Sequence, residues 1–436
     1  MMAAMLVAAL AQQPTPADTA AGRPCTLQVD SVGGNYREVA IGAREKNYYA
    51  GGGVLAHCQG TGSTLSADSV AYFQGVGRFD MVGLAHQVHI RDTALTLDAR
   101  FAAYYLRQER LDAHNRVVAV NRNTGSVLRG PNLTYYRAVK GVRDTLEMYA
   151  TGRPTIEYRD KPDSGEPYII IADRVRFKGN DRMWGAGQVT IDRSDFAASG
   201  DSMQLDQAAG FGVLVGKPRV AGKGTRSYTL TGTRIELGLQ GREVRRVKAL
   251  GNGVATGSDW RLTADTIHLH IDHKKLQQAF AWGPRDSTHA RAVSTLQTIR
   301  ADSLALDLPD EVLTEARGFG HAFSTSKKDS TAAAPVDWIA GDSLTARWAQ
   351  QADPDGAGQP RSKLHRLISR GAARSLTHHY NQRDSLPSLN YSRGALIDIL
   401  LKADRVDSVF VTGSANGVQL EPKPPADTTK KKPPTR

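Results

Sequence analysis

The sequence predicts an all-β fold, built as one elongated body from about ten strand-pair repeats. Three observations predict it: a recurring short motif, almost no helical periodicity, and few large apolar residues for the length. Aromatic residues make up 7% of the 436-residue chain, hydrophobic residues 40%, and there are 42 glycines. This composition suits a stack of shallow layers better than the three compact domains that the length alone suggests.

The motif reads apolar, any residue, Ala or Gly, usually a polar residue, any residue, apolar, any residue, apolar. Its successive copies are about 28 to 53 residues apart, most often near 32. The copies are seen at Leu65 (LSADSVAY), Leu97 (LDARFAAY), Leu128 (LRGPNLTY), Ile171 (IADRVRF, starting one residue into its copy), Ala198 (ASGDSMQL), Leu230 (LTGTRIEL), Leu262 (LTADTIHL), Ile299 (IRADSLAL), Ile339 (IAGDSLTA) and Ser392 (SRGALIDI). The sixth position is apolar in all ten copies, although the copies were not aligned on it.

The spacing within each repeat predicts a strand with a built-in corner. Positions one and three share one face of a strand, whereas positions six and eight fall on the other parity. All four can face one core only if a bulge shifts the phase between positions three and six. The small third residue leaves room for this bend, and the Asp that often follows can bond its own backbone.

Second strands, often entered through Gly, lie between the repeats. Examples start at Met81, Met183, Val247, Leu367 and Phe410. The body therefore alternates a repeat strand with a second strand.

This alternation resembles the OstA-like N-terminal family, the periplasmic lipopolysaccharide-transport proteins named for organic solvent tolerance. LSADSVAYF at Leu65, followed by FDMVGLAHQVHI at Phe79, carries the likeness best, supported by LTADTIHLHI at Leu262 and by IADRVRF with MWGAGQVTI at Ile171 and Met183. The likeness covers about residues 47–420. It implies an antiparallel β-jellyroll, open like a folded taco, whose apolar groove shields lipid acyl chains. The family also includes a translocon that continues into a transmembrane barrel, whereas the printed sequence passes into a Lys- and Pro-rich tail after an unusually long run of repeats.

The resemblance implies a carrier or bridge for lipopolysaccharide or a related anionic glycolipid, located in the periplasm, with association with the outer membrane left open. Its expected partners are other jellyroll proteins, joined by edge-strand stacking. No nucleic-acid partner is expected. The net charge of +12 suits anionic lipid heads. Moving each CH₂ group of an acyl chain from water into such a groove is favourable by about 0.8 kcal/mol.

Groove residues are expected at the sixth and eighth repeat positions. For any one of them, filling a closed core is an equally good explanation. These candidates are Val70, Tyr72, Leu133, Tyr135, Val175, Phe177, Ile235, Leu237, Ile267, Leu269, Leu304 and Leu306.

The ends of the chain suggest export. Residues 1–11 have the length and the small-residue cleavage pattern of a signal peptide, without a basic start. Residues 12–46 lead into the repeats at 47–420, and residues 421–436 form a Lys- and Pro-rich tail expected to be disordered. The two cysteines, Cys25 and Cys58, are candidates for one disulfide, with two free thiols as the alternative.

Catalytic chemistry is not expected. No GxSxG, HExxH or phosphate-binding loop motif occurs, so the sequence predicts neither an enzyme nor a cofactor. His268, His270 and His273 form the one dense histidine group, but exposed strand histidines explain it better than a metal site. Two alternatives to a lipid carrier remain: a structural or adhesive β-solenoid at the cell surface, and a glycan-acting β-helix enzyme.

Overall fold

The structure, a computed structural model, describes residues 26–421 except 60, 160, 163–164, 225, 242, 284–288, 328–334, 352–360, 380–386 and 403–404. These residues form 32 strands and two short 3₁₀-helices, η1 (Leu106–Gln108) and η2 (Pro309–Glu311). The all-β prediction is therefore confirmed. Neither of the helices in this part of the chain is long and apolar enough to span a membrane.

The chain divides into two compact units. Unit 1 comprises Met1–Arg193 and Ser199–Gly212, and unit 2 comprises Ser194–Ala198 and Val213–Arg436. The sequence predicts one continuous body and gives no sign of this division. The predicted signal peptide (1–11) and almost all of the tail (422–436) lie outside the described residues.

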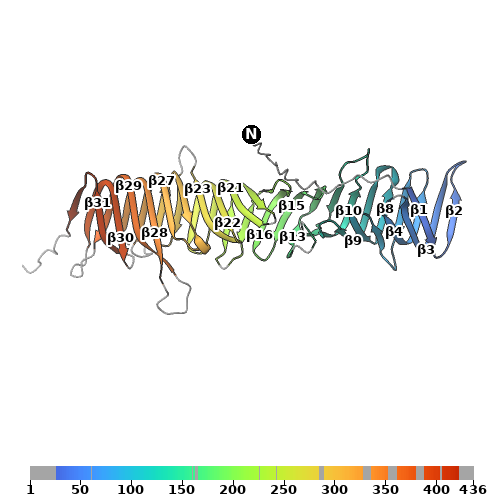
Figure 1. Ribbon diagram of the computed structural model, residues 1–436, viewed down its shortest axis with the longest axis horizontal. Coiled ribbons are helices and arrows are strands. Elements are labelled where there is room, and N and C mark those ends of the chain that lie inside the picture. Colours follow the sequence, from blue (N-terminus) through green and yellow to red (C-terminus); the bar gives the residue numbers. More distant parts are fainter. Residues whose placement is uncertain are drawn as a thin grey trace, which may run out of the picture. The chain divides into compact units, whose positions relative to one another are not determined.

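The strands of unit 1 run from blue to green in Figure 1. They are β1 (Thr26–Val32), β2 (Tyr36–Ala40), β3 (Lys46–Gln59), β4 (Thr64–Phe73), β5 (Arg78–Val82), β6 (Val88–Arg91), β7 (Leu95–Ala99), β8 (Phe101–Tyr105), β9 (Arg110–Asn121), β10 (Val127–Tyr136), β11 (Glu147–Thr151), β12 (Thr155–Tyr158), β13 (Tyr168–Ile171), β14 (Arg174–Lys178) and β15 (Arg182–Asp192). Strand pairing thus begins at Thr26, inside the segment 12–46 that the sequence describes only as a lead-in.

Two strands, β16 (Phe196–Asp206) and β17 (Phe211–Val215), contribute residues to both units. The strands of unit 2 follow them. They are β18 (Arg219–Gly222), β19 (Tyr228–Thr231), β20 (Arg234–Gln240), β21 (Glu243–Thr256), β22 (Trp260–Asp272), β23 (Lys275–Trp282), β24 (Ala290–Ser294), β25 (Gln297–Ala301), β26 (Ser303–Asp307), β27 (Glu315–Lys327), β28 (Val336–Gln351), β29 (Arg361–His379), β30 (Ser388–Lys402), β31 (Arg405–Thr412) and β32 (Asn416–Leu420).

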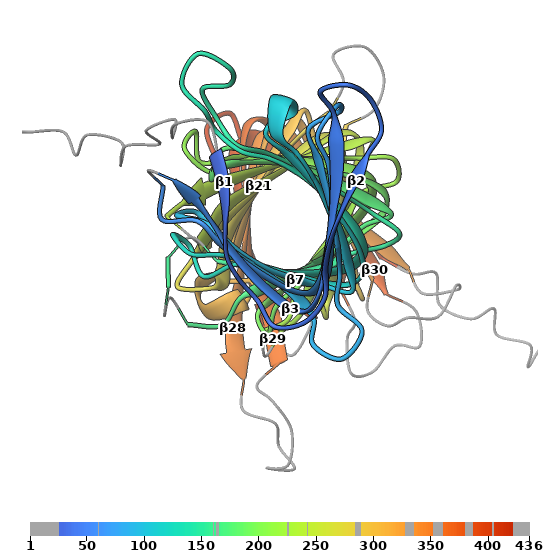
Figure 2. The ribbon, with the colours of Figure 1, turned by 90° about the vertical axis from the view of Figure 1, so that its right-hand side faces the viewer.

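Each long strand of unit 1 divides its antiparallel pairing between two short strands. In β4, residues 64–66 pair with β6 and residues 69–73 pair with β5. We call the two resulting ladders arm A (β1, β6, β7, β12, β13) and arm B (β2, β5, β8, β11, β14), each with the matching halves of β3, β4, β9, β10 and β15. Figure 2 shows β1 and β2 on opposite sides, with β3 passing below and joining them.

Unit 2 has the same construction. Its arm A contains β18, β19, β24, β25 and β32, and its arm B contains β20, β23, β26 and β31. Long strands again contribute one half to each arm. Among the strand pairings described for each unit, none joins arm A to arm B, so the arms are connected only through the corners of the long strands.

The predicted phase shift at the corner is confirmed by burial. In β22, Leu262 is buried on one parity while Ile267 and Leu269 are buried on the other. The extra residue lies on the neighbouring strand: Leu250 and Gly253 of β21 pair with Thr266 and Ala264, three residues against two. The corner is therefore a β-bulge carried by the second strand.

The aspartate of the corner acts differently from the prediction. Asp68 does not bond its own backbone. It accepts hydrogen bonds from the N–H groups of Ala85 (2.5 Å) and His86 (3.0 Å), which lie between β5 and β6. Three other corner aspartates face a left-handed Gly of the following strand, where an added Cβ would lie 2.1–2.3 Å from the aspartate oxygen. These pairs are Asp173 with Gly187, Asp302 with Gly320, and Asp342 with Gly371.

Candidate functional site

The inward face of each unit is the candidate site, because the strand pairing aligns one inward side chain per strand into continuous rows. In arm B of unit 1, one row pairs Tyr72 with Phe79, Phe79 with Tyr104, and Tyr104 with Leu111, which pairs with Tyr135. The rings of Tyr72 and Phe79 are stacked with centroids 4.2 Å apart. This row is rich in aromatic residues.

A different row runs through arm B of unit 2. It pairs Ile235 with Ala249, Ala249 with Ile267, Ile267 with Ala281, and Ala281 with Leu304. Large residues come from repeat strands and small residues from second strands. All five side chains are buried, with exposed fractions of 0–2%.

The structure places the twelve sequence-predicted groove residues on these inward faces. Eleven are buried, and Tyr72 is half-buried near the end of β4. Six belong to unit 1 and six to unit 2. They do not form one pocket, because they lie on alternate strands with small or aromatic residues between them. These intervening residues lie outside the repeat motif, although the Ala and Gly positions of the second strands were a sequence signal for them.

A cavity of about 50 Å³ lies inside unit 1 between the two arms. Leu65, Ile90 and Leu95 line it from arm A, and Leu111 and Tyr135 line it from arm B. Its walls also include Leu27, Cys58, Ser63, Thr64, Asp92, Tyr104 and Arg137. Tyr135 is the only one of the twelve candidates that lines it.

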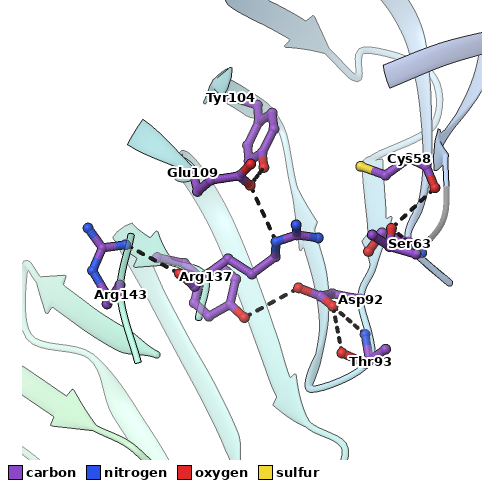
Figure 3. Close-up of polar contacts among 10 residues, drawn as sticks. Cys58, Ser63, Asp92, Thr93, Tyr104, Glu109, Arg137 and Arg143 are labelled. Carbon is purple, nitrogen blue, oxygen red and sulfur yellow. Dashed lines mark hydrogen bonds and ion pairs between the residues drawn. The ribbon is translucent and has the colours of Figure 1, made fainter. Parts of the chain in front are cut away.

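A buried ion pair adjoins this cavity (Figure 3). Arg137 Nε lies 3.3 Å from Glu109 Oε2, with 10% and 2% of the two side chains exposed. Tyr104 donates its hydroxyl hydrogen to the same carboxylate. Burial, followed by this hydrogen bond, raises the pKa of Tyr104 far above its usual value, so its hydroxyl stays protonated.

A second polar contact spans the open edge of unit 1, where the arms end in turns opposite the corners. Tyr135 of arm B donates a 3.4 Å hydrogen bond to Asp92, which follows β6 of arm A. Burial also raises the pKa of Tyr135 well above its usual value, so it remains a donor. Thr93 fixes Asp92 through its backbone N–H and its hydroxyl.

Further side chains bridge the same edge. Asn121 at the end of β9 donates to Asn180, which follows β14, at 3.0 Å. Tyr158 at the end of β12 donates to Gln207. In unit 2, Lys274 lies 3.8 Å from Asp195, and the backbone N–H of Arg226 donates to Glu311 at 3.2 Å. In both units, each contact described across the open edge involves at least one side chain, whereas each arm is held by backbone ladders.

The structure also describes one of the two cysteines and the histidine group singled out in the sequence. Cys58 is disulfide-bonded, while the predicted partner Cys25 lies just outside the described residues. His268 is half-buried and packs on Trp282, His270 is exposed, and His273 bonds Asp272. In the described ranges, no group of three or more His, Cys, Asp or Glu residues could hold a metal ion.

Comparison with known proteins gives no identification. No protein-family model matches the chain, and no curated protein is similar to it.

Proposed function

We propose that the protein is a periplasmic carrier that shields the acyl chains of lipopolysaccharide, or of a related anionic glycolipid, between the two arms of its sheet. In this proposal each unit is a β-jellyroll open along one edge, like a folded taco. The lipid chains lie among the inward rows, and the anionic head stays outside at a protein surface with a net charge of +12.

The observation that carries the proposal is the separation of the two backbone ladders. Moving arm A away from arm B breaks no described strand pairing; it breaks apolar contacts and a few hydrogen bonds, each contributing about 0.5–1.5 kcal/mol. The apolar contacts can be replaced by contacts with lipid. Removing a ten-carbon chain from water gains about 8 kcal/mol, which exceeds the loss of several edge contacts.

Opening is a required part of this function. The cavity of about 50 Å³ in unit 1 is far smaller than the roughly 300–1,000 Å³ of ordinary ligand pockets. Nearly all candidate groove residues are buried against other side chains. Lipid therefore has room between the arms only if they move apart.

The outer strands support the proposed stacking on similar proteins. Among the described strands, β1 and β2 pair only with β3, and β31 and β32 pair only with β30. Tyr36 on β2 and Phe410 on β31 are 57% and 55% exposed. Unpaired strand edges with exposed apolar side chains are suited to strand addition by a partner.

Photocrosslinking tests the proposal. A photoreactive phenylalanine replaces Tyr72 in unit 1 or Ile267 in unit 2, in a chain lacking residues 1–11. Phe73 and Trp282 are the matched controls, because each lies on the outward parity beside an inward position. Lipopolysaccharide adducts at the inward positions alone support the carrier. Absence of adducts at both inward positions, in variants with a normal circular dichroism spectrum, contradicts it and favours a structural role.

A further inference from the structure

Ser63 lies in the turn between β3 and β4, and its backbone is held in place. Its carbonyl accepts a 2.9 Å hydrogen bond from the N–H of the disulfide-bonded Cys58. Its own N–H donates to the hydroxyl of Thr61 at 3.3 Å. The position of the Ser63 side chain is therefore fixed by contacts that do not involve its hydroxyl.

The hydroxyl of Ser63 is buried without a hydrogen-bond partner in the described part of the chain. The residue is 7% exposed and lines the cavity of unit 1. A buried hydroxyl without a partner costs about 1–3 kcal/mol relative to a satisfied one. Such a group on a cavity wall indicates a ligand that completes its hydrogen bonding.

The charges around the cavity exclude an anionic ligand. Arg137 is the only cationic side chain among the lining residues, and it is already paired with Glu109. Asp92 adds a carboxylate to the same wall. An incoming carboxylate or phosphate would therefore meet like charge in a poorly solvated site, which is strongly unfavourable.

The other walls fit an aliphatic chain. Leu65, Leu95 and Leu111 face the cavity, so a methylene group there would contact only apolar carbon over most of its surface. About 50 Å³ holds one small polar group and its attached methylene. The rest of a longer chain would lie along the inward rows once the arms part.

We infer that this cavity binds an uncharged hydroxyl group carried on an aliphatic chain, with Ser63 and Asp92 as its hydrogen-bond partners. The inference rests on the proposed function, since the chain reaches the cavity by entering between the arms, and it names the part of the lipid that unit 1 recognises. A hydroxyl can donate to Asp92 while exchanging a hydrogen bond with Ser63. An acyl chain with a hydroxyl substituent has this chemistry.

Titration calorimetry with 1-octanol and octanoate tests the inference on the full chain without residues 1–11. The dissociation constant of 1-octanol is expected to be at least tenfold lower than that of octanoate. Ser63→Ala should raise the 1-octanol constant about five- to tenfold, the value of one hydrogen bond, and leave octanoate unchanged. Folding should be retained, because the Ser63 hydroxyl makes no hydrogen bond to lose.

Ser375→Ala is the matched control. Ser375 in unit 2 is also buried, with a hydroxyl that has no described partner, and it does not line the cavity. This variant should bind 1-octanol like the parent chain. An equal loss in both variants, equal binding of 1-octanol and octanoate, or no binding of either overturns the inference.

The two proposals can fail separately. If lipopolysaccharide crosslinks at Tyr72 and Ile267 while Ser63→Ala leaves 1-octanol binding unchanged, the carrier stands and the hydroxyl site falls. If 1-octanol binding depends on Ser63 but no lipopolysaccharide adduct forms, the hydroxyl site exists in a protein that is not this carrier.

Discussion

The interiors of the two units are built from the same repeat but packed differently. At the eighth repeat position of unit 2, a large residue faces a small one on the next strand, as with Leu269 and Ala279, and both are buried. At the same position of unit 1, large residues neighbour each other, as with Tyr104 and Leu111, and a cavity with polar side chains lies beside them. Interdigitation needs alternation of size, so the second strands decide where the interior is filled.

The largest difference in stability between variants of the two units is expected from the buried ion pair of unit 1. Arg137→Met in unit 1 leaves the carboxylate of Glu109 buried without its cation and should lower the free energy of unfolding by about 4 kcal/mol. Arg366→Met in unit 2 removes a partly exposed, solvent-screened pair with Asp398 and should cost much less stability. Urea titrations followed by circular dichroism measure both. Equal losses would show that the polar cluster of unit 1 is not a buried pair in solution.

Packing at the first repeat position gives the next largest effect. Leu65 and Leu262 occupy equivalent positions, but Leu65 borders the cavity and Leu262 is completely buried. Leu262→Ala should cost about 4 kcal/mol and Leu65→Ala about 2 kcal/mol, because a side chain beside a void has fewer contacts to lose. The comparison fails if the order of the two losses is reversed.

The corners should behave alike in the two units. Gly187→Ala and Gly320→Ala each place a methyl group against an aspartate at a positive φ (79° and 75°), and each should cost about 2 kcal/mol. Gly241→Ala is the control: φ is 61°, but among the described residues nothing lies within 4 Å of the added carbon, so only the conformational cost of about 1 kcal/mol is expected. Thermal unfolding of the three variants distinguishes the steric part from the conformational part.

The smallest effect concerns pH. Hydrogen bonds from the His86 backbone hold the pKa of Asp68 below its usual 3.8, which favours the ionised form in the folded state. This stabilisation is complete above the unfolded pKa and is lost as the pH falls through the folded pKa. Asp68→Asn should therefore lower the melting temperature slightly at pH 7, and the difference should shrink as the pH falls below 3.8 and through the folded pKa. A difference that grows at low pH would contradict the assignment.

Much of the fold could be predicted because a short sequence motif recurs along the chain and each copy specifies one strand layer. The ten repeats correspond to alternate strand layers, and the phase shift at the corner follows from the odd spacing between Leu262 and Ile267. Strands β1 and β2 precede the first repeat and carry no copy of its motif, so the repeat gave no signal for them.

The polar groups of unit 1 could not be found in this way. Asp92 and Tyr135 are 43 residues apart, and Asp92 lies in a turn outside the motif. Ser63 also lies just before a repeat. Such contacts depend on which turns meet at the open edge, and that is decided by the pairing of whole strands.

In the proposed carrier the arms must part for lipid to enter, and a covalent staple across the open edge of unit 1 tests this requirement. Cysteines replace Asn121 and Asn180, which bridge arm A and arm B of unit 1, and a short bis-maleimide joins them. Cysteines at His114 and Asn132, which are paired within arm B, form the control staple. Lipopolysaccharide capture is read from a photoreactive phenylalanine at Phe177. We expect the Asn121–Asn180 staple to abolish the adduct and the control staple to preserve it. An undiminished adduct in the chain stapled across the edge would show that lipid enters without parting the arms.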